Sequence, residues 1–464
     1  MKKIWALLLA VLILGLLTAC GGDAEQTPAP TTVPPTTAAT EPPMVDIGGT
    51  EVDPAVEKLA LQGMDYQLEA LTGAAGKLTG LTYIDLGTVQ MDAEQLESLR
   101  AAYPNARIDY QLSLFGGKVS NFARYLDASA MDAEKTDELL AALPLLPMLE
   151  EVNFVTEEGV CVYTVDQIDQ LEKVRQALPE AKLRVSFDLF GKTVTSEDER
   201  IEYFRVDIGN QGVEQIRAVL PYLSGCTYLL MDGCGVDNEV MAQLREDFPQ
   251  TKVVWRIWLV DEPAYNIPKL LRGASLLTDT HRVRTTYVND RNSHLLNYCT
   301  ETKYVDVGHV WDLRQCEFLK YMPDLEVCIL AISGITDITP LENHEKLEYL
   351  ELFTTDIEDI SALASCPNLE HLNLANMPKI HDITPLYGLT KLKRLRMVTS
   401  PLIPEEQKQE IARLLPNCEM LDRGYFPTAG LWRYSDPAGT IKQPRYELLC
   451  QQMEYSIDAS YGIP

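Results

Sequence analysis

The chain has 464 residues, a net charge of −28 and a hydrophobic content of 46%. An acidic excess of this size argues against nucleic acid as a partner, because binding to phosphates requires cationic side chains. The roughly 415 residues that follow the first 50 are too many for one ordinary core. The chain therefore holds either several domains or one quasi-linear array of repeats.

The first twenty residues have the pattern of an export signal. Lys2 and Lys3 precede an apolar run over residues 4–17, which is shorter than the roughly 20 residues of a membrane-spanning helix. The segment Leu17-Thr18-Ala19-Cys20 resembles a lipobox. This resemblance implies that residues 1–19 are a lipoprotein signal peptide and that Cys20 becomes the diacylated mature N-terminus. An ordinary signal peptide with an incidental cysteine is the alternative.

Residues 20–50 are rich in Thr, Pro and Ala. This composition offers too little apolar surface to offset chain entropy, so we expect an extended, solvated tether. A lipid anchor, a tether and the lack of a second membrane signal suit a Gram-positive envelope. The expected location is extracellular, with the chain attached to the cell membrane through the lipid on Cys20.

A repeat of 22–23 residues is clear between residues 301 and 423. Leu325, Leu347, Leu369 and Leu392 each open a segment of the form L-x-x-L-x-L, with Cys328 and Met397 in place of one leucine in two of them. A segment of the form I-x-D-I-x-x-L follows in three of the copies. Alternating apolar residues predict a short strand with one buried face. Because one such unit cannot enclose a core, the copies must stack.

This pattern resembles the leucine-rich-repeat family, and its I-x-D-I-x-x-L portion is similar to the bacterial surface proteins called internalins. The resemblance implies an α/β fold, a leucine-rich-repeat solenoid with parallel strands on its concave face. One departure concerns the position that often carries an inward Asn. Ser333, Thr355 and Met377 occupy it here, so a regular asparagine ladder is absent.

The N-terminal half repeats on a longer unit. Three similar segments contain Pro104, Pro179 and Pro249, and each pairs an amphipathic helix with a strand of period two. The order of helix, L-P-x-L and strand resembles the longer, helix-bearing leucine-rich repeats. We interpret residues 51–262 in this way, and a separate domain of small α/β units is the alternative.

Two stretches break the repeat pattern. Residues 263–300 are unusually cationic, with Lys269, Arg272, Arg282, Arg284 and Arg291, and are interpreted as a degenerate repeat or as an irregular insert. Residues 424–464 are irregular and contain Trp432. Since a repeat array needs a cap over its last open core, we expect a C-terminal cap there, with a separate ligand module as the alternative.

The motifs of metal, phosphate and nucleophilic chemistry are absent from the sequence. The carboxylates of Asp232 and Asp237 resemble a calcium loop only weakly. His371 and His381 fall within one repeat but on different faces, which argues against a shared metal. The cysteines are irregularly spaced, which favours buried thiols over a disulfide framework. We therefore expect no enzymatic activity and no cofactor or metal.

The repeat geometry instead selects a surface, because the third and fifth positions of L-x-x-L-x-L point away from the core. Exposed aromatic and aliphatic residues on such a face are typical of protein interfaces. The sequence predicts a binding strip centred on Tyr349, Phe353, His371 and Arg396. The full set of candidates is Tyr304, Asp306, Val327, Ile329, Tyr349, Glu351, Phe353, His371, Asn373, Arg394 and Arg396. In the alternative interpretation, the tail folds into the concavity and these residues are only packed.

Together these features favour a cell-surface protein that binds a protein or glycan as a monomer and is not an enzyme. The anchor and tether would hold the array outside the cell. A solute-binding or envelope-complex accessory lipoprotein is one alternative, although solenoids are poorly shaped for closed pockets. An enzyme with an unrecognised module is the other.

Overall fold

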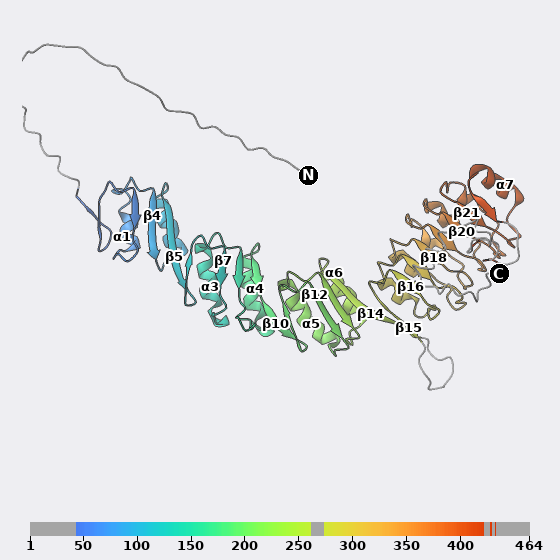
Figure 1. Ribbon diagram of the computed structural model, residues 1–464, viewed down its shortest axis with the longest axis horizontal. Coiled ribbons are helices and arrows are strands. Elements are labelled where there is room, and N and C mark those ends of the chain that lie inside the picture. Colours follow the sequence, from blue (N-terminus) through green and yellow to red (C-terminus); the bar gives the residue numbers. More distant parts are fainter. Residues whose placement is uncertain (1–42, 261–272, 422–426, 429–431, 433–464) are drawn as a thin grey trace, which may run out of the picture.

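The computed structural model describes residues 43–260, 273–421, 427–428 and 432. Its elements follow one another in chain order along an elongated row of stacked units (Figure 1). No helix among these residues has both the length and the apolar character needed to cross a membrane. The α/β repeat array expected from the sequence is confirmed.

Residues 58–277 form three modules of similar build, each with three parallel strands, two helical segments and a closing β-hairpin. A small ribbon of β1 (Val45–Asp46) and β2 (Glu51–Val52) precedes them. The elements of module 1 are β3 (Lys58–Ala60), α1 (Leu68–Gly73), β4 (Tyr83–Thr88), α2 (Ala93–Ala102), β5 (Arg107–Leu114) and β6 (Gly117–Ser120). Strands β3, β4 and β5 are parallel, and β6 returns antiparallel to β5.

Modules 2 and 3 repeat this order. Module 2 contains β7 (Tyr125–Asp127), α3 (Thr136–Ala142), β8 (Glu151–Asn153), α4 (Ile168–Ala177), β9 (Lys182–Arg184), β10 (Ser186–Leu189) and β11 (Lys192–Thr195). Module 3 contains β12 (Arg200–Phe204), α5 (Gly209–Val219), β13 (Tyr228–Asp232), α6 (Asn238–Asp247), β14 (Lys252–Val260) and β15 (Gly273–Leu277). The helices cover one face of each small sheet, as Figure 1 shows for α5 and α6.

Each module ends in a hairpin that interrupts the parallel sheet. In modules 1 and 2 the hairpin turns are Phe115-Gly116 and Phe190-Gly191, and all four residues have positive φ. A two-residue hairpin turn of this kind requires left-handed backbone, which explains the glycine in each pair. In module 3 residues 261–272, which join β14 to β15, lie outside the described residues.

A buried polar residue closes each hairpin. The backbone N–H groups of Asn121, Ser196 and Thr278 donate to the carbonyls of Tyr110, Val185 and Trp255, respectively. The same three side chains accept hydrogen bonds from the N–H groups of Tyr110, Val185 and Trp255. These reciprocal bonds satisfy both the N–H and the C=O of Tyr110, Val185 and Trp255 at the base of each hairpin.

The C-terminal part is one seven-stranded parallel sheet. Its strands are β16 (Arg282–Arg284), β17 (Tyr304–Asp306), β18 (Val327–Ile329), β19 (Tyr349–Glu351), β20 (His371–Asn373), β21 (Arg394–Arg396) and β22 (Glu419–Leu421). Short 3-10 helices return the chain in most repeats, and α7 (Glu405–Leu414) does so in the last. The sheet begins at β16, so the stacked repeats start before residue 301.

Part of residues 263–300 has the same order of elements as the later repeats. Strand β16 pairs in register with β17, and the 3-10 helix η5 (Ser293–Tyr298) follows it, as in the later repeats. Residues 273–277 belong instead to the hairpin of module 3. Residues 263–272 lie outside the described residues.

One apolar core runs through both halves of the chain. It extends from Val45 to Cys418 and includes the repeat leucines that the periodicity identified. Across the junction of the halves, the rings of Trp255 and Tyr298 lie 5.4 Å apart, and Nη1 of Arg245 donates to the carbonyl of Tyr298. The shared core and these contacts join the N-terminal modules to the C-terminal sheet.

Hydroxyl groups take the place of the missing asparagine ladder. Ser333 and Thr355 are buried and donate to the carbonyls of Leu330 and Leu352. Where Met377 offers no such group, Ser400 of the following repeat donates across to Leu374 and accepts from the N–H of Met377. The turn after each strand is thus held by a buried side-chain hydrogen bond in three of these repeats.

Candidate binding surface

The face of the sheets that points away from the main core is called the strand face here. In the C-terminal sheet, Tyr304, Val327, Tyr349, His371 and Arg394 lie side by side as one row of the ladder. Asp306, Ile329, Glu351, Asn373 and Arg396 form the second row. The structure therefore brings together all the strand residues that the repeat spacing placed on one face.

The expectation that this strip is exposed is wrong for most of its residues. Tyr304 and Asp306 are half-buried, whereas the other nine candidates are buried: Val327, Ile329, Tyr349, Glu351, Phe353, His371, Asn373, Arg394 and Arg396. The reason is that Trp432 lies on the strand face and forms a second apolar cluster with Val327, Tyr349 and Phe353. The described tail residues thus fit the alternative in which the tail folds into the concavity.

Trp432 is held by polar contacts as well as by apolar ones. Its Nε1 donates to Oε1 of Glu351 at 2.7 Å, and Nη1 of Arg394 donates to its carbonyl at 3.2 Å. Its ring lies 5.9 Å from that of Tyr349 and 6.5 Å from that of His371. Because buried polar groups need hydrogen-bond partners, these contacts offset the cost of covering Glu351 and Arg394.

Positive charge gathers at one end of this site. Arg394 donates to Glu419 at 2.7 Å, and its guanidinium lies 5.8 Å from the centre of the Trp432 ring. Burial lowers the pKa of Arg396, and the neighbouring charge of Arg394 lowers it further. Since desolvated charges are costly, this end of the site favours contact with carbonyl or carboxylate oxygens.

The strand face of modules 1–3 is open, and sequence reasoning did not single it out. It carries four exposed aromatic side chains, Phe122, Tyr125, Phe204 and Trp258, with exposed fractions between 45% and 57%. Tyr125, Phe204 and Trp258 lie on strands whose alternate residues are buried in the main core. In the alternating pattern of these strands, the aromatic residues take the outward-facing positions. This is the sequence signal that could have identified them.

Charged groups lie beside these aromatic rings. The guanidinium of Arg107 lies 4.6 Å from the centre of the Phe122 ring. On module 3, Arg256 and Asp232 form a two-pronged ion pair at 2.7 Å, which lowers the pKa of Asp232 mainly through the hydrogen bonds from Arg256. This pair lies on the strand face between Phe204, which neighbours Asp232, and Trp258.

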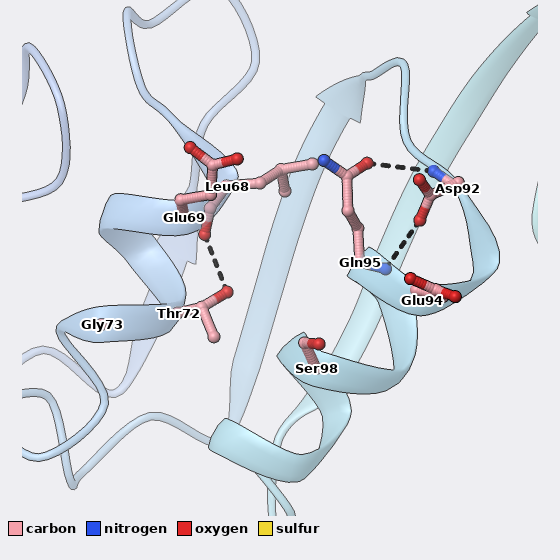
Figure 2. A pocket seen from close by; sticks show the side chains of 8 residues that line it. All are labelled: Leu68, Glu69, Thr72, Gly73, Asp92, Glu94, Gln95 and Ser98. Atoms are coloured by element: carbon pink, nitrogen blue, oxygen red, sulfur yellow. Dashed lines mark hydrogen bonds between the residues drawn. The ribbon is translucent and has the colours of Figure 1, made fainter.

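A shallow pocket between α1 and α2 encloses about 480 Å³ (Figure 2). Its polar groups are largely used within the helices. Asp92 and Gln95 form the reciprocal capping box of α2, and the hydroxyl of Thr72 donates to the carbonyl of Leu68. The other hydroxyl group among its lining residues belongs to Ser98.

The weak metal candidates have other partners. Among the described residues no group of three or more His, Cys, Asp or Glu is placed to hold a metal ion. Asp232 is paired with Arg256, and Asp237 accepts from Asn210. His381 lies near Glu358, whereas His371 lies against Trp432.

The cysteines of the described residues are thiols. Eight are free and seven of these are buried, including both members of the pairs Cys226 with Cys234 and Cys299 with Cys316. Burial raises the pKa of Cys299 and Cys316 to about 12. Such thiols act as small apolar core residues with low nucleophilicity.

Comparison with known protein families identifies a leucine-rich repeat in the C-terminal sheet. The family model described as Leucine Rich repeats (2 copies) matches residues 345–388, which include β19 and β20. No curated protein matches the chain. Solved structures similar to it include two internalins from Listeria monocytogenes and a leucine-rich-repeat protein from Leptospira interrogans.

The likeness to these structures is low in sequence and in superposition. Internalin C2 is 24% identical, covers 29% of this chain and 70% of its own, and has a TM-score of 0.23. The second internalin, InlF, is 16% identical over 80% and 83% of the two chains, with a TM-score of 0.27. The Leptospira protein is 14% identical over 79% and 96%, with a TM-score of 0.28.

Proposed function

We propose that this chain, in which residues 282–421 are stacked leucine-rich repeats, is a non-enzymatic binding protein held at the outer surface of a bacterial cell. The lipobox-like segment ending at Cys20 and the Thr- and Pro-rich tether of residues 20–50 support the anchored location. The array supplies a long, rigid strand face outside the membrane. Its ligand is an extracellular protein.

The observation that carries this proposal is the open strand face of module 3. Phe204 and Trp258 are each more than half exposed there, on either side of the Asp232–Arg256 ion pair. Large aromatic side chains on a rigid exposed sheet lower solubility without contributing to the core. Aromatic residues and arginine are the types enriched at the centres of protein interfaces.

A paired-variant experiment tests this surface. The mature chain would be probed against a panel of purified extracellular proteins and a glycan array, and the hits repeated with the double variant Phe204→Ala/Trp258→Ala. We expect protein ligands whose affinity falls at least tenfold in this variant. Tyr321→Ala is the control, because Tyr321 is similarly exposed but lies in the 3-10 helix η6 (Glu317–Tyr321), outside the strand ladder.

Two results would contradict the proposal. If the double variant binds every protein hit as the unaltered chain does, the module 3 face is not the binding surface. If only glycans bind, the ligand class is wrong. Circular dichroism of each variant shows whether the fold is kept, so a loss of binding is not mistaken for unfolding.

The anchor is tested separately, by labelling cells with a radioactive fatty acid. We expect label on the unaltered chain and none on Cys20→Ala, which should be released from the membrane fraction or remain unprocessed. Label on Cys20→Ala would show that lipid is attached elsewhere. Membrane release without any label on the unaltered chain would favour the ordinary signal peptide.

A further inference from the structure

Exposed aromatic side chains lie in two places on the open strand face of modules 1–3. Phe122 and Tyr125, where module 1 meets module 2, form the first patch, and Phe204 and Trp258 on module 3 form the second patch. Tyr125 points outward, because the alternate residue of β7 is buried in the main core. Phe122 lies on the same face, since the guanidinium of Arg107, an outward residue of β5, is 4.6 Å from the centre of its ring.

The second patch by itself is too small for a stable protein interface. Strands β12 to β15 present about a dozen side chains on the strand face, because alternate strand residues point into the core. A stable interface between two proteins takes about 20–30 residues from each side. The contact surface of a protein that binds the second patch must therefore extend beyond module 3.

The first patch gives the direction of this extension. Beyond module 3, none of the strands β16–β22 carries an exposed large apolar side chain among the described residues. In the other direction, module 2 and the end of module 1 add about ten outward strand positions together with Phe122 and Tyr125. At least five strand spacings separate β7 from β14, which corresponds to roughly 25 Å.

The surface between the two patches is charged but balanced. Nε of Arg184 lies 3.2 Å from Glu197 and 3.8 Å from Glu151, and Nη2 of Arg200 lies 2.7 Å from Glu202. These arginines are thus paired within the strand face, although the chain as a whole has a net charge of −28. A protein that covers this surface needs no excess charge of either sign opposite it.

We propose that one folded protein binds both patches at once. Its contact face is roughly 25 Å long or more, is apolar at its two ends and has no large net charge between them. This inference rests on the function proposed above, because it takes the module 3 face as part of the binding surface. It adds Phe122 and Tyr125 to that surface, and it excludes a short peptide, which buries too few residues.

The test uses the purified extracellular proteins that the unaltered mature chain binds in the panel described above. Their affinities are measured by biolayer interferometry for the unaltered chain, for Phe122→Ala/Tyr125→Ala and for Phe204→Ala/Trp258→Ala. We expect each double variant to lower the affinity for the same protein at least tenfold, since large aromatic side chains dominate the energy of such interfaces.

The control variant is Met148→Ala. Met148 is 44% exposed in module 2 but lies outside the strands, so its removal should leave the affinity unchanged. Because the four aromatic side chains of the patches are about half exposed, the double variants should keep their fold, which circular dichroism checks. If Phe122→Ala/Tyr125→Ala unfolds, Tyr125→Ala takes its place, since it leaves the Phe122 ring beside Arg107.

Two further measurements test the character of the partner. Synthetic peptides of about 15 residues that tile each bound protein should not bind measurably, because none of them can fill an interface of about 20–30 residues. Raising the salt concentration from about 0.05 M to about 0.5 M should change the affinity of the whole protein by less than about threefold, because the ion pairs of the strand face are internal to it.

Loss of affinity in only one of the two double variants would overturn this inference. If the affected variant is Phe204→Ala/Trp258→Ala, the function proposed above still stands. If neither double variant lowers the affinity for any bound protein, or if no protein of the panel binds, both proposals fail. A peptide that binds as tightly as its parent protein, or an affinity that falls more than tenfold with salt, would show that the partner is a peptide or a highly charged protein instead.

Discussion

Replacing Thr278 with valine removes one buried hydrogen bond at the end of module 3 while keeping the shape of the side chain. The hydroxyl of Thr278 accepts from the backbone N–H of Trp255 at 3.2 Å, and the Thr278 side chain is almost fully buried. After the substitution this N–H loses its side-chain acceptor. The backbone bond from the N–H of Thr278 to the carbonyl of Trp255 remains.

A buried donor left without an acceptor costs about 1–3 kcal/mol. The added methyl group of valine offsets part of this, so we expect local stability to fall by about 1–2 kcal/mol. A change of that size corresponds to roughly a 5–30-fold shift in the opening equilibrium. Hydrogen exchange of the Trp255 amide should accelerate by that factor.

Residue-resolved hydrogen exchange is the suitable assay, because an array of repeats need not unfold as a single unit. Thr193→Val is the control, since the Thr193 hydroxyl is exposed and bonds only to Asp188 among the described contacts. If the Trp255 amide exchanges at the same rate in Thr278→Val as in the unaltered chain, the closing role assigned to this residue is refuted.

Three further predictions concern stability. Thr354 has a φ of 58°, and Asn376 takes the same position of the next repeat. Asparagine tolerates this left-handed backbone better than threonine does. The substitution Thr354→Asn should therefore raise the midpoint of urea unfolding by the equivalent of about 0.5–1 kcal/mol. Ser400→Ala removes a donor and an acceptor from buried backbone groups and should lower stability by about 1–3 kcal/mol in the same assay; an unchanged midpoint would contradict it. Hydrogen bonds from Arg175 are the largest cause that lowers the pKa of Glu172 from 4.5 to about 2. The stabilisation by Glu172 is therefore complete above pH 4.5 and is lost as the pH falls toward 2. The unaltered chain should melt at a higher temperature than Glu172→Gln above pH 4.5, and this difference in melting temperature should shrink as the pH falls toward 2. The difference should be modest, because the ion pair is partly solvated.

The sequence predicted most of the repeat geometry because the spacing is nearly strict. Leu325, Leu347 and Leu369 are fully buried, and the strand positions placed on one face do lie in two adjacent rows. Prediction was weaker where the repeat lost its leucines. In the first C-terminal repeat Val283 takes the inward strand position, and the surrounding arginines hid a strand that pairs in normal register.

The hairpins that divide the N-terminal half show a different limit. Asn121, Ser196 and Thr278 take the same structural role, but they are different residue types, and Thr278 lies 23 residues after the residue it bonds, whereas Asn121 and Ser196 each lie 11 residues after theirs. What they share is a short polar side chain that can accept from a backbone N–H. That equivalence appears only when the two strands of each hairpin are placed side by side.

The order of residues along the chain was enough to determine the period, the inward leucines and the direction in which each strand residue points, because these depend on contacts between neighbouring units. The state of the C-terminal strand face depended on the tertiary structure. Trp432 and Glu351 are 81 residues apart, and their contact has no periodic signal. The repeat spacing determines how neighbouring units pack against one another. It does not determine which distant segment covers the outer face of the sheet.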